Sequence, residues 1–112
     1  GDTAVVAEID ATLVGAAWFR FWDDANHSFG YVSPDVPELA IAIAAAYRGQ
    51  GIGRKLLEAL IQAAAGANIA QLSLSVEWDN PAHHLYESIG FKIVGHVGNA
   101  NTMTIHTRVQ PG

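Results

Sequence analysis

The chain has 112 residues and a formal net charge of -5; half of the residues are apolar and none is cysteine. This length fits one domain, residues 1–112, with a real core. The lack of cysteine excludes disulfides, thiolate metal sites and cysteine nucleophiles, and the acidic balance argues against general nucleic-acid binding. No signal peptide and no stretch near the ~20 apolar residues of a membrane span is visible. We therefore expect a cytoplasmic protein with no nucleic-acid or membrane partner.

The first part of the chain is predicted to form three strands. Residues 3–9 are short, apolar and β-branched, and residues 13–22 alternate between two faces. One glycine and two prolines mark residues 23–37 as a loop. Residues 38–43 are predicted to form the third strand, although their alanines would otherwise favour a helix.

The second part of the chain is predicted to alternate helices and strands. A helix is expected over residues 51–65, because its apolar residues recur on one face. Residues 71–77 alternate as a strand does, residues 80–89 have the caps of a short helix, and residues 91–97 and 102–109 indicate two final strands. The predicted order is β-β-β-α-β-α-β-β. The apolar stripe of the long helix consists of Ile52, Leu56, Leu57, Leu60 and Ile61.

The junction before the long helix is the most informative segment. Residues 47–53 read Tyr-Arg-Gly-Gln-Gly-Ile-Gly. Glycines let backbone N–H groups approach a ligand closely, and the start of a helix favours an anion. Arg48, Arg54 and Lys55 are half of the six cationic residues of this acidic chain. The combination predicts a phosphate site.

The spacing of the glycines shows which known phosphate-binding motif this segment fits. A P-loop needs Gly-Lys-Ser/Thr, but Gly53 is followed by Arg-Lys-Leu, and the dinucleotide fingerprint fails from either Gly49 or Gly51. The pattern Arg48-x-x-Gly51-x-Gly53 does fit another signature. It resembles R/Q-x-x-G-x-G/A, the acyl-CoA motif of the GNAT N-acetyltransferase superfamily. An ordinary glycine turn before a core helix is the alternative.

A second segment strengthens this resemblance. Residues 80–91 read Asn-Pro-Ala-His-His-Leu-Tyr-Glu-Ser-Ile-Gly-Phe, which is similar to the other GNAT signature, N-x-x-a-x-x-L-Y-x-x-x-G-F. The local physics also fits, since Asn80 suits an N-cap, Pro81 the first helical position and Gly90 the helix end. The alternative is merely a well-capped short helix. Both signatures in this order identify the chain as a member of the superfamily.

The resemblance implies an α/β (α+β) fold: a mixed, mostly antiparallel sheet with two helices, the GNAT-like acyl-CoA N-acyltransferase fold from its second strand onward. The first strand and first two helices of the family domain have no counterpart here. That absence leaves the activity of this form open. It also leads us to expect a homodimer, or association with the missing N-terminal segment.

The family transfers an acetyl group from acetyl-CoA to a primary amine by direct attack. The resemblance places the donor's pyrophosphate on the backbone of residues 49–54, with charge from Arg48, and its pantothenate arm along the preceding strand. Asn80 matches a family asparagine that contacts CoA, although capping explains it equally well. The predicted donor-binding residues are Ile41, Ala42, Ile43, Arg48, Gly49, Gln50, Gly51, Ile52, Gly53, Arg54 and Asn80.

Two residues are predicted to move protons. Glu38 is the candidate base, acting through water, because an amine with a pKa of ~10.4 must lose a proton before it attacks; Asp35 is a weaker alternative. Tyr86 matches the family tyrosine that often protonates the departing thiolate. The structural alternatives are a solvated carboxylate at a strand start and a core tyrosine.

The acceptor stays open: an amine-bearing small molecule, or a peptide or protein. The adjacent His83 and His84 point about 100° apart on a helix and cannot chelate together, so no metal is predicted. A different class of function is also open, namely a non-catalytic acyl-CoA-binding or interaction module of the same fold.

Overall fold

The computed structural model describes residues 3–22, 25 and 31–107. Within these residues the chain forms a six-stranded sheet, two α-helices and one short 3-10 helix. In chain order the elements are β1 (Thr3–Ile9), β2 (Thr12–Arg20), β3 (Glu38–Ile43), η1 (Ala45–Tyr47), α1 (Ile52–Gly66), β4 (Gln71–Glu77), α2 (Ala82–Ile89), β5 (Lys92–Val97) and β6 (Ala100–His106).

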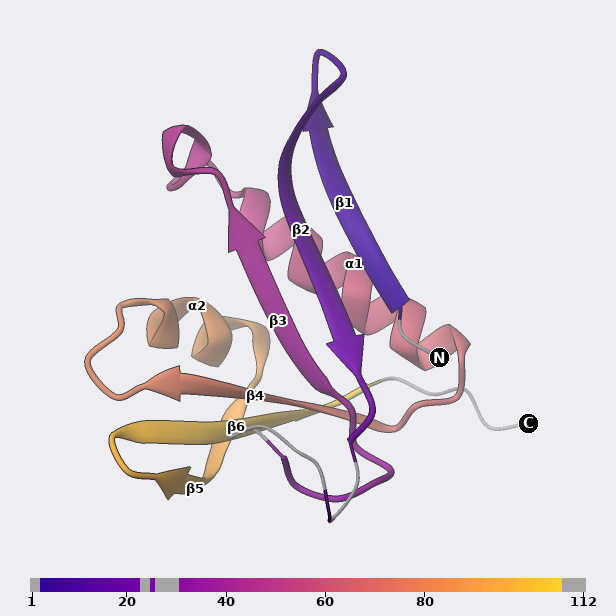
Figure 1. Cartoon of the computed structure of the whole chain (residues 1–112), viewed down its shortest axis with the longest axis vertical. Helices are drawn as coiled ribbons and strands as arrows, with labels where there is room; N and C mark the ends of the chain where they lie inside the picture. Colours follow the sequence, from indigo (N-terminus) through magenta and orange to yellow (C-terminus); the bar gives the residue numbers. More distant parts are fainter. Residues whose placement is uncertain (1–2, 23–24, 26–30, 108–112) are drawn as a thin grey trace.

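The strand order in the sheet is β1-β2-β3-β4-β6-β5, and β3 with β4 is the parallel pair among antiparallel neighbours (Figure 1). This confirms the predicted fold class and order of elements. The structure adds η1 between β3 and α1. The predicted loop at 23–37 lies partly outside the described residues, and the predicted strand end at 108–109 lies wholly outside them.

Side chains of β2 and β3 alternate between a buried face and an exposed face of the sheet. In β2, Ala17 and Phe19 are buried, whereas Trp18 between them is 39% exposed. In β3, Leu39 is buried and Ala40 and Ala42 are exposed. Those alanines thus form the outer face of a strand whose register with β2 is continuous from residue 38 to 43. Tertiary pairing has overridden their intrinsic helix propensity.

Both helices pack on the same face of the sheet. Leu56, Leu57 and Leu60 on α1 are buried in one core cluster that also contains Tyr86 of α2 and Leu74 of β4. Figure 1 shows α1 behind β1, β2 and β3. None of the described helices is long and apolar enough to cross a membrane.

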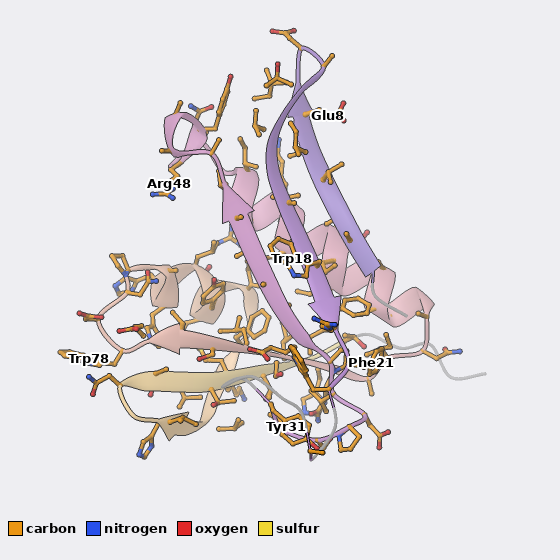
Figure 2. All side chains as sticks on the ribbon, in the orientation of Figure 1. Glu8, Trp18, Phe21, Tyr31, Arg48 and Trp78 are labelled. Carbon is orange, nitrogen blue, oxygen red and sulfur yellow. The ribbon has the colours of Figure 1, made fainter. Side chains whose placement is uncertain are left out.

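The opposite face of β1, β2 and β3 carries no helix in the part of the chain that the structure describes (Figure 1). Trp18 lies on this face (Figure 2), beside exposed positions on the neighbouring strands. β1 is also an outer strand of the sheet, and Val6 on it is 57% exposed. Exposed apolar residues therefore extend from this face of the sheet to its edge at β1.

Candidate functional site

Strands β3 and β4 meet at one end and separate along the rest of their length. Glu38 and Ser73 form their single register pair, and the Ser73 N–H donates to the Pro37 carbonyl at 3.0 Å. Figure 1 shows the two strands diverging beyond this point. The sheet therefore opens in its middle, between a β1-β2-β3 half and a β4-β6-β5 half.

The divergence exposes one backbone edge of β3. The Ala44 N–H donates to the Val14 carbonyl on β2 at 2.8 Å, and hydrogen-bonded positions alternate along an antiparallel pair. By this alternation Ala42 directs its backbone groups toward β2, while Ile41 and Ile43 direct theirs toward the opening. Three positions were predicted to bind the pantothenate arm. Two of them, Ile41 and Ile43, present free backbone groups with which an extended ligand can form hydrogen bonds.

The glycine-rich loop continues from this edge into α1. Gly49 has φ 78° and Gly51 φ 80°, a region that residues with a Cβ rarely adopt. Neither position has a heavy atom within 4 Å of where a Cβ would stand. Glycine is thus required here by backbone conformation, and the space in front of the loop is open.

The loop also presents backbone donors. From Gly49 to Arg54, no N–H group donates to a backbone carbonyl within the described residues, and the first to do so is that of Lys55, which bonds Gly51 at 3.3 Å. Unpaired N–H groups together with the positive end of a helix form an anion site. The predicted pyrophosphate residues therefore lie on one continuous turn.

Two cationic side chains near the loop hold it in place. Arg48 Nε donates to the Ile43 carbonyl at 3.4 Å, and Figure 2 shows Arg48 beside the loop that follows β3. Arg54 Nη2 donates to Ser88 Oγ on α2 at 2.5 Å. Ser88 in turn donates to the Leu85 carbonyl at 2.7 Å. Both side chains thus keep their positive charge near the start of α1, while their hydrogen bonds tie the loop to β3 and α2.

Gly53 brings the two sequence signatures together. A Cβ at this position would lie 3.2 Å from Ile43 Cδ1 and 3.4 Å from Leu85 Cδ2. The start of α1 therefore packs closely against both β3 and α2. The third glycine of the loop is needed for close approach rather than for backbone conformation.

Asn80 caps α2. Its Oδ1 accepts a hydrogen bond from the Ala82 N–H at 2.9 Å, and its carbonyl accepts one from the His83 N–H at 3.1 Å, as an N-cap residue does. In the signature the asparagine precedes the leucine by six positions, and six positions before Leu85 is Asp79. The match at Asn80 thus departs from the signature spacing by one residue, and a donor contact by Asn80 stays a prediction.

Tyr86 is 8% exposed and packs edge-on against Phe91, with ring centroids 5.8 Å apart. Burial raises the pKa of the Tyr86 phenol above its ordinary value of 10.0, because the charged phenolate loses its hydration. No hydrogen bond to its hydroxyl is found among the described residues. The phenol is thus protonated at neutral pH, as a proton donor must be.

Glu38 lies where β3 and β4 part. Its side chain is half-buried, and its Oε1 atom is fully buried. Arg20 is its register partner on β2, so both side chains leave the same face of the sheet. This is the face opposite the helices, since Leu39 points into the core. A carboxylate at the apex of the opening is well placed for an acceptor that approaches from this side.

Three buried polar residues, among them Thr102, were not anticipated from the sequence. Ser73 is fully buried, although it alternates with Leu72 and Leu74 along β4. His83 is 8% exposed, with Nε2 at 3.4 Å from Asn101 Nδ2. No sequence signal marks any of them, because segments distant in sequence bury them. Within the described residues, no group of three or more His, Asp or Glu side chains could hold a metal ion.

Two curated proteins are similar to this chain. Mycothiol acetyltransferase from Corynebacterium aurimucosum is 34% identical over 83 residues, covering 73% of this chain and 25% of that protein. The L-amino acid N-acyltransferase MnaT from Escherichia coli is 29% identical over 109 residues, covering 91% of this chain and 57% of that protein. The chain thus spans between a quarter and about three fifths of these relatives.

Solved structures share the fold. The paia N-acetyltransferase of Thermoplasma acidophilum, solved with coenzyme A, has a TM-score of 0.77 at 20% identity, covering 94% of this chain and 60% of that one. The ribosomal-protein-S18-alanine N-acetyltransferase of Escherichia coli has a TM-score of 0.77 at 25% identity, covering 99% and 72%. The model of the acetyltransferase (GNAT) family matches residues 1–91. The chain therefore belongs to the GNAT acetyltransferase family.

Proposed function

We propose that this domain transfers an acetyl group from acetyl-CoA to a primary amine by direct attack. The observation that carries the proposal is the meeting of two backbone features: the open edge at Ile41 and Ile43, and the glycine loop at the start of α1. CoA joins an amide-containing arm to a diphosphate. A strand edge suits the arm, and a helix start with unpaired N–H groups suits the diphosphate.

The proposed reaction uses three groups of the chain. The amine nitrogen attacks the thioester carbonyl, whose oxygen is stabilised by a backbone N–H on the β3 edge. Before the attack, the ammonium form of the amine gives up one proton to Glu38 through water. After the attack the carbon–sulfur bond breaks, the CoA thiolate takes a proton from Tyr86, and the second proton of the nitrogen goes to the phenolate left on Tyr86. The products are an N-acetyl amide and the CoA thiol.

The similar proteins support this chemistry without choosing the acceptor. A yncA acetyltransferase of Salmonella typhimurium, solved with acetyl-CoA, has a TM-score of 0.77 at 24% identity, covering 92% of this chain and 63% of that one. MnaT is named for amino acid acylation, and another relative for a ribosomal protein. We therefore propose either an amine-bearing small molecule or a peptide or protein as acceptor. A cytoplasmic location stays a prediction.

Two measurements test the proposal. Calorimetry with acetyl-CoA measures donor binding, and a thiol-release assay measures transfer to a panel of an amino acid, a polyamine, a peptide N-terminus and a protein lysine. We expect binding and transfer to one class of amine. Binding without transfer would favour a non-catalytic acyl-CoA-binding module, and the absence of both would refute the proposal.

A further inference from the structure

Arg54 lies where a cation does not help the helix. The first turn of α1, residues 52–55, holds Arg54 and Lys55 and no acidic residue. The start of a helix carries partial positive charge, so cations there lower the stability of the helix. Local stability therefore does not explain these residues, whereas an anion bound beside them would offset the repulsion.

The guanidinium of Arg54 is held by α2 and not by a carboxylate. Glu58 lies four positions further along α1, where an acidic side chain commonly pairs with an arginine. Arg54 nevertheless forms no ion pair within the described residues. Its Nη2 instead donates to Ser88 Oγ at 2.5 Å, across 34 positions of the sequence.

The Ser88 hydroxyl is arranged to accept this bond. Its own proton is donated to the Leu85 carbonyl, at 2.7 Å, so the oxygen keeps its lone pairs for Arg54. The carboxylate next to Ser88 in sequence, that of Glu87, has its Oε1 atom 3.9 Å from His83 Nδ1. A neutral hydroxyl thus fixes the guanidinium of Arg54 without cancelling its charge.

This contact stands beside the proposed anion site. Arg54 directly follows Gly53, whose close approach to Leu85 joins the start of α1 to α2. The backbone N–H of Arg54 is also among those that donate to no backbone carbonyl within the described residues. A guanidinium matches a phosphate in both charge and geometry. Backbone and side chain of Arg54 are therefore both suited to a phosphate at this helix start.

We infer that Ser88 is a positioning residue for donor binding: it holds Arg54 so that the uncancelled charge of the guanidinium meets a phosphate of CoA. The inference rests on the proposed function, which supplies the phosphate. Ser88 belongs to the second sequence signature and Arg54 directly follows the first. The contact thus makes donor affinity depend on both signatures at once.

Calorimetry with CoA tests the inference in four chains: the parent, Ser88→Ala, Arg54→Ala and the double variant. We expect each single variant to raise the Kd by about three- to tenfold, because an exposed charge or bond contributes modestly. Ser88→Ala should add nothing in the Arg54→Ala background, since the two residues act as one unit. With pantetheine, which has no phosphate, the four chains should not differ.

Two further substitutions separate the position of Arg54 from its charge. Ser88→Thr keeps the hydroxyl and should restore the Kd of the parent. Ser88→Asp would hold Arg54 by an ion pair that cancels its charge, so CoA binding should weaken at least as much as in Ser88→Ala. An effect of Ser88→Ala that persists with 3′-dephospho-CoA assigns the contact to the diphosphate, and one that vanishes assigns it to the 3′-phosphate.

Four results would overturn the inference and leave the proposed function standing. These are an unchanged Kd for CoA in Ser88→Ala, an equal loss from Ser88→Ala in both backgrounds, parent-like binding in Ser88→Asp, and a loss that pantetheine shares. The last would assign Ser88 to the fold, and a lowered Tm of Ser88→Ala would accompany it. A parent chain that binds no CoA would refute the proposed function and this inference with it.

Discussion

At the scale of single residues, the two candidates for proton transfer lie on different elements. Glu38 begins β3, whereas Tyr86 lies on α2 and packs against Phe91, the residue before β5. Their environments also differ, because Tyr86 is enclosed by apolar groups and Glu38 has Arg20 opposite. An acid and a base need such different surroundings in order to hold opposite protonation states at one pH.

Replacing Tyr86 by Phe should lower turnover by ~10²–10⁴-fold, the range for general acid–base catalysis, while donor affinity is kept because the ring remains. Tyr47→Phe, in η1, is the matched control. Steady-state kinetics and calorimetry separate the two effects. Normal turnover in Tyr86→Phe would assign this tyrosine to the core alone.

The raised pKa of Tyr86 also has a consequence for stability. The folded chain keeps this proton at a pH where the unfolded chain loses it, so the free energy of unfolding should fall as the pH rises above 10.0. Alkaline unfolding curves should show a smaller fall in Tyr86→Phe, which cannot ionise there. Identical pH dependence in both chains would contradict the burial effect.

Replacing Glu38 by Gln should move the pH–rate profile to higher pH. Without a base the amine must lose its proton to solvent, and the neutral fraction of an amine with a pKa of ~10.4 grows with pH. Asp35→Asn, in the turn before β3, is the control. A profile that moves in Asp35→Asn instead would transfer the role of base to Asp35.

At the scale of elements, we predict that the loop between η1 and α1 determines donor binding. Gly51→Asp would add a negative charge in front of the N–H groups and should weaken CoA binding by at least about tenfold, or ~1.4 kcal/mol. Gly98→Asp is a matched control, because Gly98 also has a positive φ and open space, but lies in the β5–β6 turn. Equal affinities of the two variants in calorimetry would show that CoA binds elsewhere.

The packing of α1 against β3 and α2 can be tested by comparing two substitutions at opposite ends of α1. Gly53→Val should destabilise the fold by about 1–3 kcal/mol, because its side chain would press on Ile43 and Leu85. Gly66→Val at the other end of α1 meets no atom within 4 Å and should have little effect. Chemical denaturation measures both. Equal stabilities would show that the contact at Gly53 is loose.

At the scale of the whole molecule, the described residues leave one sheet face and one sheet edge uncovered. Val6 and Trp18 lie there with 57% and 39% exposure, and β1 has neither lysine nor proline to discourage pairing. Contiguous apolar surface of this kind usually marks a contact. We predict that the 112-residue chain self-associates through this edge or face, most simply as a two-fold dimer, or binds a complementary segment.

Light scattering should therefore give a mass above the 11.9 kDa of one chain. Val6→Lys would place a charge on the edge strand and should shift the chain toward the monomer. A parent chain that stays monomeric at high micromolar concentration, with no fragment detected by mass spectrometry, would contradict the prediction.

Local patterns were enough to predict the elements and both motifs. Alternation identified β2 and β4, a 3.6-residue stripe identified α1, and Asn80 with Gly90 delimited α2. These signals act over a few residues, so they can be read without knowing the fold. The resemblance carried by the two motifs then identified the GNAT family, and the match over residues 1–91 confirmed it.

Contacts between distant segments decided the rest. The single register pair of β3 with β4 opens the sheet and sets Ser73 beside Glu38. The register of β3 with β2 leaves the backbone groups of Ile41 and Ile43 facing the opening. Full burial of Ser73 was invisible in an alternating strand, because alternation tells which side chains share a face and not what covers that face. The sequence by itself determined the local elements and the donor motif, whereas tertiary pairing decided which groups meet, because register and burial depend on strands far apart in the chain.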